Sequence, residues 1–321
     1  MKHVFIVNPT SCKRKREELM EKEIRRTAEE AGEKYEIYRT SAPGDGKRYV
    51  KELCEKLCAS GERIRIYACG GDGTINEVVN GAFGYENAEI GAVPLGTGND
   101  YIRNYGRPAD FLDIGGQMKG ASRLSDLIRY RAFCGGRESE GFCANMFNIG
   151  FDCNVVDMTA RIKRFPLFKG SLAYLISVLI ILVKKKGANL RIEYEDGRVS
   201  DGRILLTAVA NGCYCGGGIK GVPYSRLDDG LMDVSVINDV TRRFFVRLFP
   251  EYSRGTHLEN REMTEKKVIS YSKEKTLKIW ANDGTLRLCT DGEITTQERV
   301  EFSVVRDAFR FIVPKGADKQ P

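Results

Sequence analysis

The sequence predicts an α/β fold joined to a mainly β fold: a doubly wound parallel sheet in the N-terminal part, and an antiparallel, β-sandwich-like domain in the C-terminal part. Strand and helix signals alternate at short intervals over the first hundred residues, whereas β-branched stretches joined by turn dipeptides dominate after about residue 130. The length of 321 residues, with 42% hydrophobic and 30% charged residues, is sufficient for two domains with ordinary cores.

The N-terminal part alternates apolar segments with charged amphipathic ones. Each charged segment has helical spacing, and the first two end at a glycine, Gly32 and Gly61, as helices commonly do. Strands that alternate with helices form parallel sheets, whose ligands bind at the carboxyl ends of the strands. We expect strands at residues 2–8, 34–40, 63–69 and 88–94, and helices at 15–32, 46–61 and 74–83.

The C-terminal part has a different pattern. One long helical region is expected at roughly 155–186, followed by β-branched stretches at 190–212, 230–237, 275–296 and 300–305. Asp196-Gly197, Asp283-Gly284 and Asp291-Gly292 are hairpin-type turn signals. We therefore place the domains at 1–128 and 129–306, the second one mostly antiparallel with helices laid on it.

Charge and cysteine usage narrow the class of protein. The net charge of +7, from 51 basic and 44 acidic residues, favours an anionic partner: a nucleotide, a phospholipid surface or a nucleic acid. No basic segment is interleaved with aromatic residues, so a nucleic-acid partner is not expected. The ten cysteines are scattered and only two histidines are present, which favours a reduced, cytosolic chain over a disulfide framework or a zinc site.

The longest apolar run covers residues 172–183. Twelve residues are too few to cross a bilayer core, which needs about 20. The run predicts either a buried helix of the second domain or a helix that lines an apolar cleft or touches a membrane surface. In the second case Lys163, Arg164 and Lys169 would meet anionic headgroups.

The stretch CGGDGTINE, residues 69–77, has the features of a phosphate-binding loop. Gly70, Gly71 and Gly73 let the backbone approach a ligand closely, and the helix that follows presents free amide groups. Thr74 and Glu77 predict a capping box at the start of this helix. No lysine follows Gly73, which excludes a P-loop, and Asn76 stands where the dinucleotide fingerprint has a glycine. The sequence thus predicts phosphate binding by backbone amides.

Asp72 stands among these amides, where a carboxylate repels phosphate unless it contacts a metal ion, a metal-bound water or a hydroxyl group. Two further loops follow strands of the same predicted sheet. Residues 93–100 supply Gly96, Thr97, Gly98, Asn99 and Asp100, and residues 7–15 supply Thr10, Ser11 and a basic run. The two glycine loops leave carboxyl ends of strands in one sheet, so we expect them to face one crevice. The segment 7–15 is a third candidate, although a basic run by itself is more typical of a solvated face.

Taken together, the motifs NPTS, GGDGTINEVVNG and PLGTGND resemble the catalytic domain of the diacylglycerol kinase, sphingosine kinase and bacterial lipid kinase family. The second half continues the resemblance with NIGFDCNVV, NGCYCGGGIKGVPYSRLDDGLMDV and TDGE. The resemblance implies an NAD kinase/phosphofructokinase-like nucleotide-binding domain, to which a returning C-terminal segment, about 307–321, is added. It also implies a kinase that transfers the γ-phosphate of ATP to the hydroxyl of a membrane lipid, with diacylglycerol as the first candidate.

The resemblance also implies roles for individual residues. Glu293 matches the base that takes the proton from the lipid hydroxyl, and Asp72 is expected to organise Mg²⁺ or the acceptor. Cys12 departs from the family, which usually has glycine there, so a side chain is expected to crowd the nucleotide if this position needs positive φ or a close approach of the ligand. The ATP-contacting positions are Asn8, Pro9, Thr10, Ser11, Cys12, Thr40, Gly71, Asp72, Gly73, Thr74, Ile75, Asn76, Glu77 and Thr97, and the positions of a structural Mg²⁺ are Arg226, Asp229 and Leu231.

Two alternatives remain open at this point. One is a soluble-substrate kinase similar to NAD kinases, and the other is a lipid- or nucleotide-binding module without catalysis. For a lipid kinase we expect a cytoplasmic protein, peripheral to the inner face of the membrane, with a lipid substrate at the membrane surface and a possible homodimer. The sequence does not identify the lipid.

Overall fold

The structure, a computed structural model, describes residues 1–58, 61–150 and 187–317. The chain divides into two compact units, Met1–Leu127 with Arg306–Pro321, and Ile128–Val305. The apolar run 172–183, the helix expected at about 155–186, and Lys163, Arg164 and Lys169 lie outside the described residues. No helix in the described part is long and apolar enough to span a membrane.

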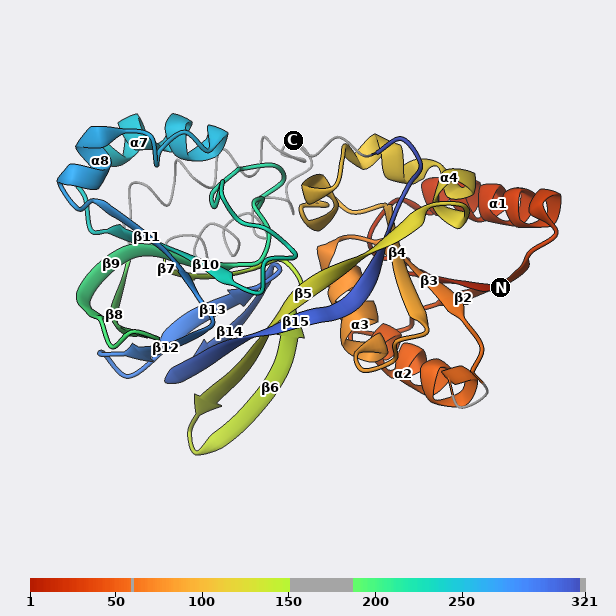
Figure 1. The fold of residues 1–321 in the computed structure, drawn as a ribbon, viewed down its shortest axis with the longest axis horizontal. Helices are drawn as coiled ribbons and strands as arrows, with labels where there is room; N and C mark the ends of the chain where they lie inside the picture. Colours follow the sequence, from red (N-terminus) through yellow and green to blue (C-terminus); the bar gives the residue numbers. More distant parts are fainter. Residues whose placement is uncertain (59–60, 151–186, 318–321) are drawn as a thin grey trace. The chain divides into compact units, whose positions relative to one another are not determined.

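The first unit contains a parallel sheet with the strand order β2-β1-β3-β4, to which the end of β15 (Arg299–Val313) adds in parallel beside β4 (Figure 1). Its elements are β1 (Lys2–Val7), α1 (Arg14–Ala31), β2 (Lys34–Arg39), α2 (Asp45–Cys58), β3 (Ile64–Gly70), α3 (Asp72–Ala82), β4 (Ala88–Pro94), the 3₁₀ helices η1 (Tyr101–Asn104) and η2 (Pro108–Leu112), and α4 (Ile114–Met118).

Helices cover both faces of this sheet. α1 packs with α4 on one face, where Phe5, Val7, Tyr67 and Cys69 form a core, and α2 packs with α3 on the other (Figure 1). All seven residues of β3 and all seven of β4 are therefore buried. Both strands are mostly apolar, and their charged exceptions, Arg65 and Glu89, form an ion pair at 2.8 Å. The doubly wound α/β prediction is confirmed. Gly32 ends α1 in the left-handed conformation, with φ 67°, as expected for a C-terminal glycine.

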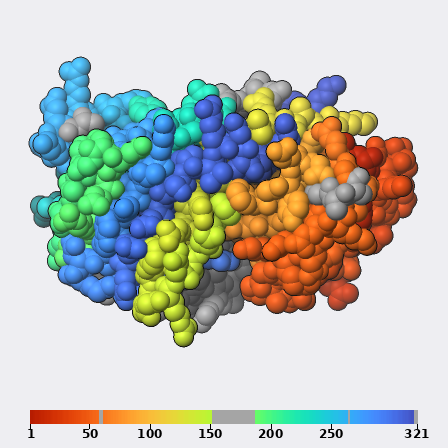
Figure 2. Space-filling view, turned by 60° about the horizontal axis from the view of Figure 1, so that its bottom comes forward, coloured from red at the N-terminus to blue at the C-terminus, as the bar shows by residue number. Residues whose placement is uncertain are grey.

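The second unit is mainly antiparallel, with the strand order β14-β13-β7-β9-β8-β12-β15, and β10 between β9 and β11. The β5–β6 hairpin lies at the surface (Figure 2). β5 and β15 each belong partly to the first unit, because the unit boundaries fall within them. The elements are β5 (Ala121–Cys134), β6 (Arg137–Cys143), β7 (Met146–Gly150), β8 (Ala188–Tyr194), β9 (Val199–Ala210), β10 (Met232–Asn238), α7 (Arg242–Arg254), α8 (Arg261–Glu265), β11 (Ile269–Glu274), β12 (Thr276–Ala281), β13 (Leu286–Thr290), β14 (Glu293–Gln297) and β15 (Arg299–Val313).

Two apolar clusters form the core of this unit, one on each face of the sheet. Strand residues alternate between them: Phe147 and Val209 belong to one cluster, and Met146 and Ala208 to the other, which α7 covers with Phe245 and Leu248. The antiparallel, sandwich-like prediction is confirmed.

The Asp-Gly turns do not all close hairpins. Gly197, Gly284 and Gly292 all have positive φ, as turn glycines do, and the first and third join paired strands, β8 with β9 and β13 with β14. Asp283-Gly284 instead joins β12 to β13, which pair with different neighbours, so the hairpin expected there is wrong. A turn dipeptide fixes a reversal of the chain, not the pairing that follows it.

Candidate nucleotide-binding and catalytic residues

The two glycine-rich loops after β3 and β4 lie against each other. The amides of Leu95 and Gly96 both donate to the carbonyl oxygen of Gly70, at 2.9 and 3.0 Å. A Cβ atom on Gly96 would lie only 2.5 Å from Cα of Gly71, so only glycine fits at this contact. The expectation that both loops meet at the carboxyl ends of adjacent strands is therefore correct.

The helix after the first loop begins earlier than expected. Gly71 is the N-cap residue of α3 and no side chain caps the helix, so the capping box predicted for Thr74 and Glu77 is wrong. The reason is that the helix starts at Asp72, which puts Thr74 inside its first turn. The Glu77 carboxylate instead accepts from the amides of Gly44 and Gly46, at 2.8 and 3.0 Å, and holds the loop before α2.

The first-turn amides of α3 are thus left without a side-chain cap. A Cβ atom on Gly73 would meet no atom within 4 Å, so the start of the helix faces open space. A helix start of this kind, preceded by glycines, is suited to bind an anion such as phosphate.

The loop after β1 lies at the same edge of the sheet. Asn8 Oδ1 accepts from the amide and the hydroxyl of Thr10, at 3.0 and 2.8 Å, and Asn8 Nδ2 donates to Thr74 Oγ1 at 3.2 Å. Ser11 Oγ would lie 3.1 Å from a Cβ atom on Gly70. At the end of β2, the Thr40 amide donates to the Val7 carbonyl at 2.9 Å. The structure therefore brings the predicted ATP-contacting segments 8–12, 40 and 71–74 together.

Three of the residues predicted to contact ATP differ in how exposed they are. Ile75 is buried in the core, with only 3% of the residue exposed, so its side chain is not accessible to a ligand. Asn76 is half-buried and accepts from the side chain of Asn80. Thr97 is exposed.

The Cys12 side chain packs against the apolar core beneath α1, and burial raises the pKa of its thiol. Its φ is not positive, so the backbone strain considered for a non-glycine residue at this position does not arise.

Two carboxylates converge beside the second loop. Asp72 Oδ1 accepts from the Tyr101 amide at 3.0 Å, and a Cβ atom on Gly98 would lie 2.9 Å from Asp72 Oδ2 and 3.1 Å from Asp100 Oδ2. Burial raises the pKa of Asp72, although the amides of Tyr101, Asp100 and Asn99 act in the opposite direction. The sequence assigned no role to Asp100, yet it is the side chain that completes a paired-carboxylate arrangement.

Asn99 is a second residue whose position the sequence did not predict. It has φ 52°, a left-handed conformation that asparagine tolerates better than most residues. Its Nδ2 donates to the Gly96 carbonyl at 3.0 Å, while its Oδ1 is buried and has no hydrogen-bond partner within the described ranges. A buried acceptor without a partner beside the two glycine loops fits a site that takes a polar ligand.

In the second unit, the turn that carries Glu293 is held by the preceding aspartate. Asp291 Oδ1 accepts from the Met146 amide at 3.1 Å and its Oδ2 accepts from Cys143 Sγ at 3.2 Å. Asp291 and Gly292 have φ 45° and 97° and form the two-residue turn between Thr290 and Glu293. Glu293 itself is exposed and makes no ion pair with any residue that the structure describes. The turn is thus fixed while its carboxylate remains accessible.

In the loop expected to hold a structural Mg²⁺, the charge of the Asp229 carboxylate is already compensated by the Lys273 ammonium group. Asp229 Oδ1 accepts from the Leu231 amide at 3.1 Å, and Asp229 Oδ2 accepts from Lys273 Nζ at 2.8 Å. Arg226 pairs with Asp228 at 3.2 Å. Across residues 1–58, 61–150 and 187–317, no three His, Cys, Asp or Glu side chains are grouped to hold a metal ion. These contacts do not fit a divalent cation.

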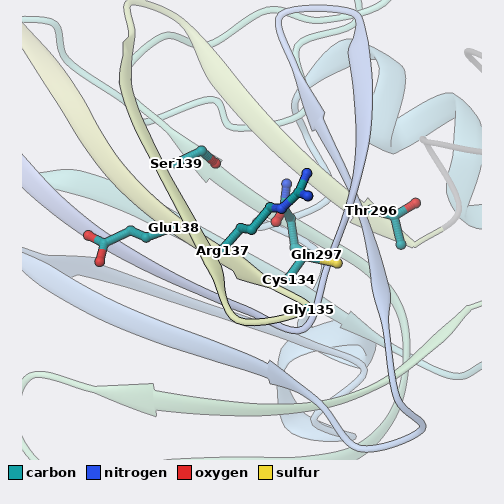
Figure 3. A pocket seen from close by; sticks show the side chains of 7 residues that line it. All are labelled: Cys134, Gly135, Arg137, Glu138, Ser139, Thr296 and Gln297. Atoms are coloured by element: carbon teal, nitrogen blue, oxygen red, sulfur yellow. The ribbon is translucent and has the colours of Figure 1, made fainter.

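A cavity of about 590 Å³ lies between the β5–β6 turn and β14 (Figure 3). Arg137 points towards Cys134 and Gln297, whereas Glu138 points away and pairs with Arg131 at 2.6 Å. None of the predicted site residues lines this cavity.

The comparisons with known proteins agree with this arrangement. The family model described as the diacylglycerol kinase catalytic domain matches residues 2–130, and the model described as the YegS C-terminal NAD kinase beta sandwich-like domain matches residues 145–313. The chain is 28% identical to the diacylglycerol kinase of Bacillus subtilis (strain 168), over 98% of this chain and 97% of the relative. It is 30% identical to the diacylglycerol kinase of Staphylococcus carnosus (strain TM300), over 97% and 94%.

Among solved structures, a diacylglycerol kinase from Bacillus anthracis str. Sterne has the same fold, with a TM-score of 0.68 and 20% identity over 99% of this chain and 98% of that chain. The two family models follow one another along the chain, and the Staphylococcus carnosus relative is similar over almost its whole length. The chain therefore belongs to the family defined by the diacylglycerol kinase catalytic domain and the YegS-type C-terminal domain.

Proposed function

We propose that this protein is an ATP-dependent lipid kinase that transfers the γ-phosphate of ATP to the hydroxyl group of a membrane lipid, with diacylglycerol as the first candidate acceptor. The observation that carries the proposal is the contact between the two glycine loops, Gly70–Gly73 and Leu95–Gly98, beside the uncapped start of α3. Relatives over almost the whole chain are named diacylglycerol kinases, which supports a lipid acceptor.

Phosphoryl transfer requires a protein mainly to position the donor and the acceptor in line and to stabilise negative charge. In this chain the amides at the start of α3 would bind phosphate oxygens, and the Asn8–Cys12 loop would close the site from the side of β1. Asp72 and Asp100 supply the carboxylate oxygens that Mg²⁺ prefers, so these residues fit a nucleotide-bound Mg²⁺. When bound, Mg²⁺ neutralises the charge of the β- and γ-phosphates.

Glu293 is the proposed base. An exposed carboxylate is able to take the proton of an acceptor hydroxyl, and the Asp291 contacts with Met146 and Cys143 hold the turn that carries Glu293. This assignment rests on the match of Asp291-Gly292-Glu293 to the family motif.

The test is to replace Glu293 by glutamine, which keeps the shape of the side chain and removes its basicity. We expect lipid phosphorylation from radiolabelled ATP to be lost while ATP binding, measured by calorimetry, is retained. Glu259→Gln, the same change at another exposed carboxylate of the second unit, is the matched control and should keep full turnover. Undiminished turnover in Glu293→Gln would exclude Glu293 as the base.

The acceptor is identified by presenting a panel of hydroxyl lipids, NAD and no acceptor, with the product analysed by mass spectrometry. Phosphorylated NAD would favour the soluble-substrate alternative. ATP consumption that does not depend on added lipid would contradict the lipid kinase proposal.

We also propose that the protein works at a membrane surface, peripheral to the inner face of the membrane. The solvent-facing side of α7 supports this proposal: Arg243, Val246, Arg247 and Arg254 are exposed there, while Phe245 and Leu248 face the core. Arginines around an exposed apolar residue are suited to an anionic lipid surface.

A further inference from the structure

The ammonium group of Lys273 lies in a cage of oxygen atoms. Its Nζ is 2.8 Å from Asp229 Oδ2, 3.0 and 3.1 Å from the two carboxylate oxygens of Asp233, and 3.3 Å from the carbonyl oxygen of Tyr224. Asp233 on β10 and Lys273 on β11 are direct cross-strand partners, so sheet register fixes this pair.

The buried Asp233 carboxylate requires the positive charge of Lys273 as its counter-charge. The Asp233 side chain is fully buried, that of Asp229 is 19% exposed and that of Lys273 is 32% exposed. The Tyr271 hydroxyl also donates to Asp233. A buried carboxylate is costly unless it is paired and hydrogen-bonded, and Lys273 and Tyr271 together meet both requirements.

The oxygen cage has the composition of a hard-cation site. Two carboxylates and a main-chain carbonyl are ligands that Mg²⁺ and Ca²⁺ prefer. The loop is also the one in which the family resemblance implies a structural Mg²⁺, at Arg226, Asp229 and Leu231. In this chain both Asp229 oxygens are engaged, one by the Leu231 amide and the other by Lys273.

We propose that the Lys273 ammonium replaces the structural divalent cation of this loop, so that residues 224–233 are held in place by a covalently attached cation. A divalent ion at Asp229 would lie next to the ammonium group and be repelled by it. To admit the ion, Lys273 would have to leave, and Asp233 would then lose its counter-charge. The proposal does not depend on the lipid kinase function, because it concerns only the stability of the loop.

The experiment measures the melting temperature of the nucleotide-free protein in EDTA and in millimolar Mg²⁺. Because Asp72 and Asp100 are also expected to attract Mg²⁺, all measurements are repeated in an Asp72→Asn background. We expect the wild-type chain to melt at the same temperature with and without Mg²⁺. We expect Lys273→Met to melt several degrees lower in EDTA and to recover part of the loss when Mg²⁺ is added.

The matched control is Lys275→Met, an exposed lysine two residues further along the chain, which should melt like the wild type in both buffers. Two results would overturn the proposal. The first is a Mg²⁺-dependent rise in the melting temperature of Asp72→Asn that disappears in the double variant Asp72→Asn/Asp229→Asn. This result would show that the loop binds a metal ion although Lys273 is present. The other is a Lys273→Met chain as stable as the wild type in EDTA. The wild-type measurement decides the proposal even if Lys273→Met does not fold.

Discussion

His257 is expected to make the second unit less stable in mild acid. Its side chain is fully buried beside Tyr252, with the two ring centroids 4.9 Å apart. Burial lowers the pKa of His257 from 6.5 to about 4, and the nearby Glu251 carbonyl and carboxylate oppose the shift without cancelling it. The unfolded chain therefore binds a proton at His257 at a higher pH than the folded chain does.

The sign and size of the effect follow from these two pKa values. A histidine with a lowered pKa in the folded state contributes stability above pH 6.5, and this contribution is lost as the pH falls from 6.5 towards 4. Each pKa unit corresponds to about 1.4 kcal/mol, so the complete loss is about 3 kcal/mol, of which about 2 kcal/mol is lost between pH 7 and pH 5.

The assay compares the wild type with His257→Phe, which keeps an aromatic ring against Tyr252 and does not titrate. Trp280, the only tryptophan of the chain, lies on β12 in the same unit and reports its unfolding in urea. We expect the free energy of unfolding to fall by about 2 kcal/mol less in the variant than in the wild type between pH 7 and pH 5. Tyr252→Phe, which removes a hydroxyl and no titrating ring, should keep the wild-type pH dependence. Identical slopes in His257→Phe and wild type would refute the reasoning.

Two further predictions concern the proposed nucleotide site and the membrane surface. Gly96→Ala puts a Cβ atom 2.5 Å from Cα of Gly71 and should weaken ATP binding, measured by calorimetry, by about tenfold or more. The control is Gly115→Ala, whose Cβ atom would lie 3.5 Å from its nearest neighbour and which should bind ATP normally. Equal affinities of the two variants would contradict the proposed role of the loop contact. The double change Arg243→Glu and Arg254→Glu should reduce sedimentation of the protein with vesicles of anionic lipid, most strongly at low salt. The same change at Arg129 and Arg131 on β5 is the control and should reduce sedimentation less. Equal binding by the two variants would remove α7 from the membrane proposal.

The N-terminal sheet was predictable because local patterns decide it. Mostly apolar runs at 64–70 and 88–94, each followed by glycines, identify buried parallel strands without any long-range information. The strands β5, β6 and β11 were not predicted, because their sequences mix charged and small residues. Arg129 and Arg131, for example, are exposed on β5 and pair with acidic residues across the hairpin.

The sequence predicts which loops form the candidate site, but not the side-chain contacts that hold them. Glycines reveal close backbone approach, so the meeting of Gly71 with Gly96 follows from strand order. Glu77 was assigned to the wrong partner, because its actual partners, the amides of Gly44 and Gly46, lie about thirty residues earlier in the chain. Lys273 lies 44 residues from Asp229, and only the pairing of β10 with β11 brings them together.

The last strand has a consequence for synthesis of the chain on the ribosome. The end of β15 adds to the first unit beside β4, where Arg310 and Phe311 pair with Glu89 and Ile90. Phe311 is fully buried, and its ring lies 4.9 and 4.8 Å from the rings of Tyr101 and Tyr105. Many chains fold their N-terminal domain as soon as it leaves the ribosome. In this chain the edge of β4 that faces away from β3 remains unpaired until residues beyond 309 are translated, so the first unit is completed last. Premature termination of translation would leave this strand edge exposed and prone to aggregation.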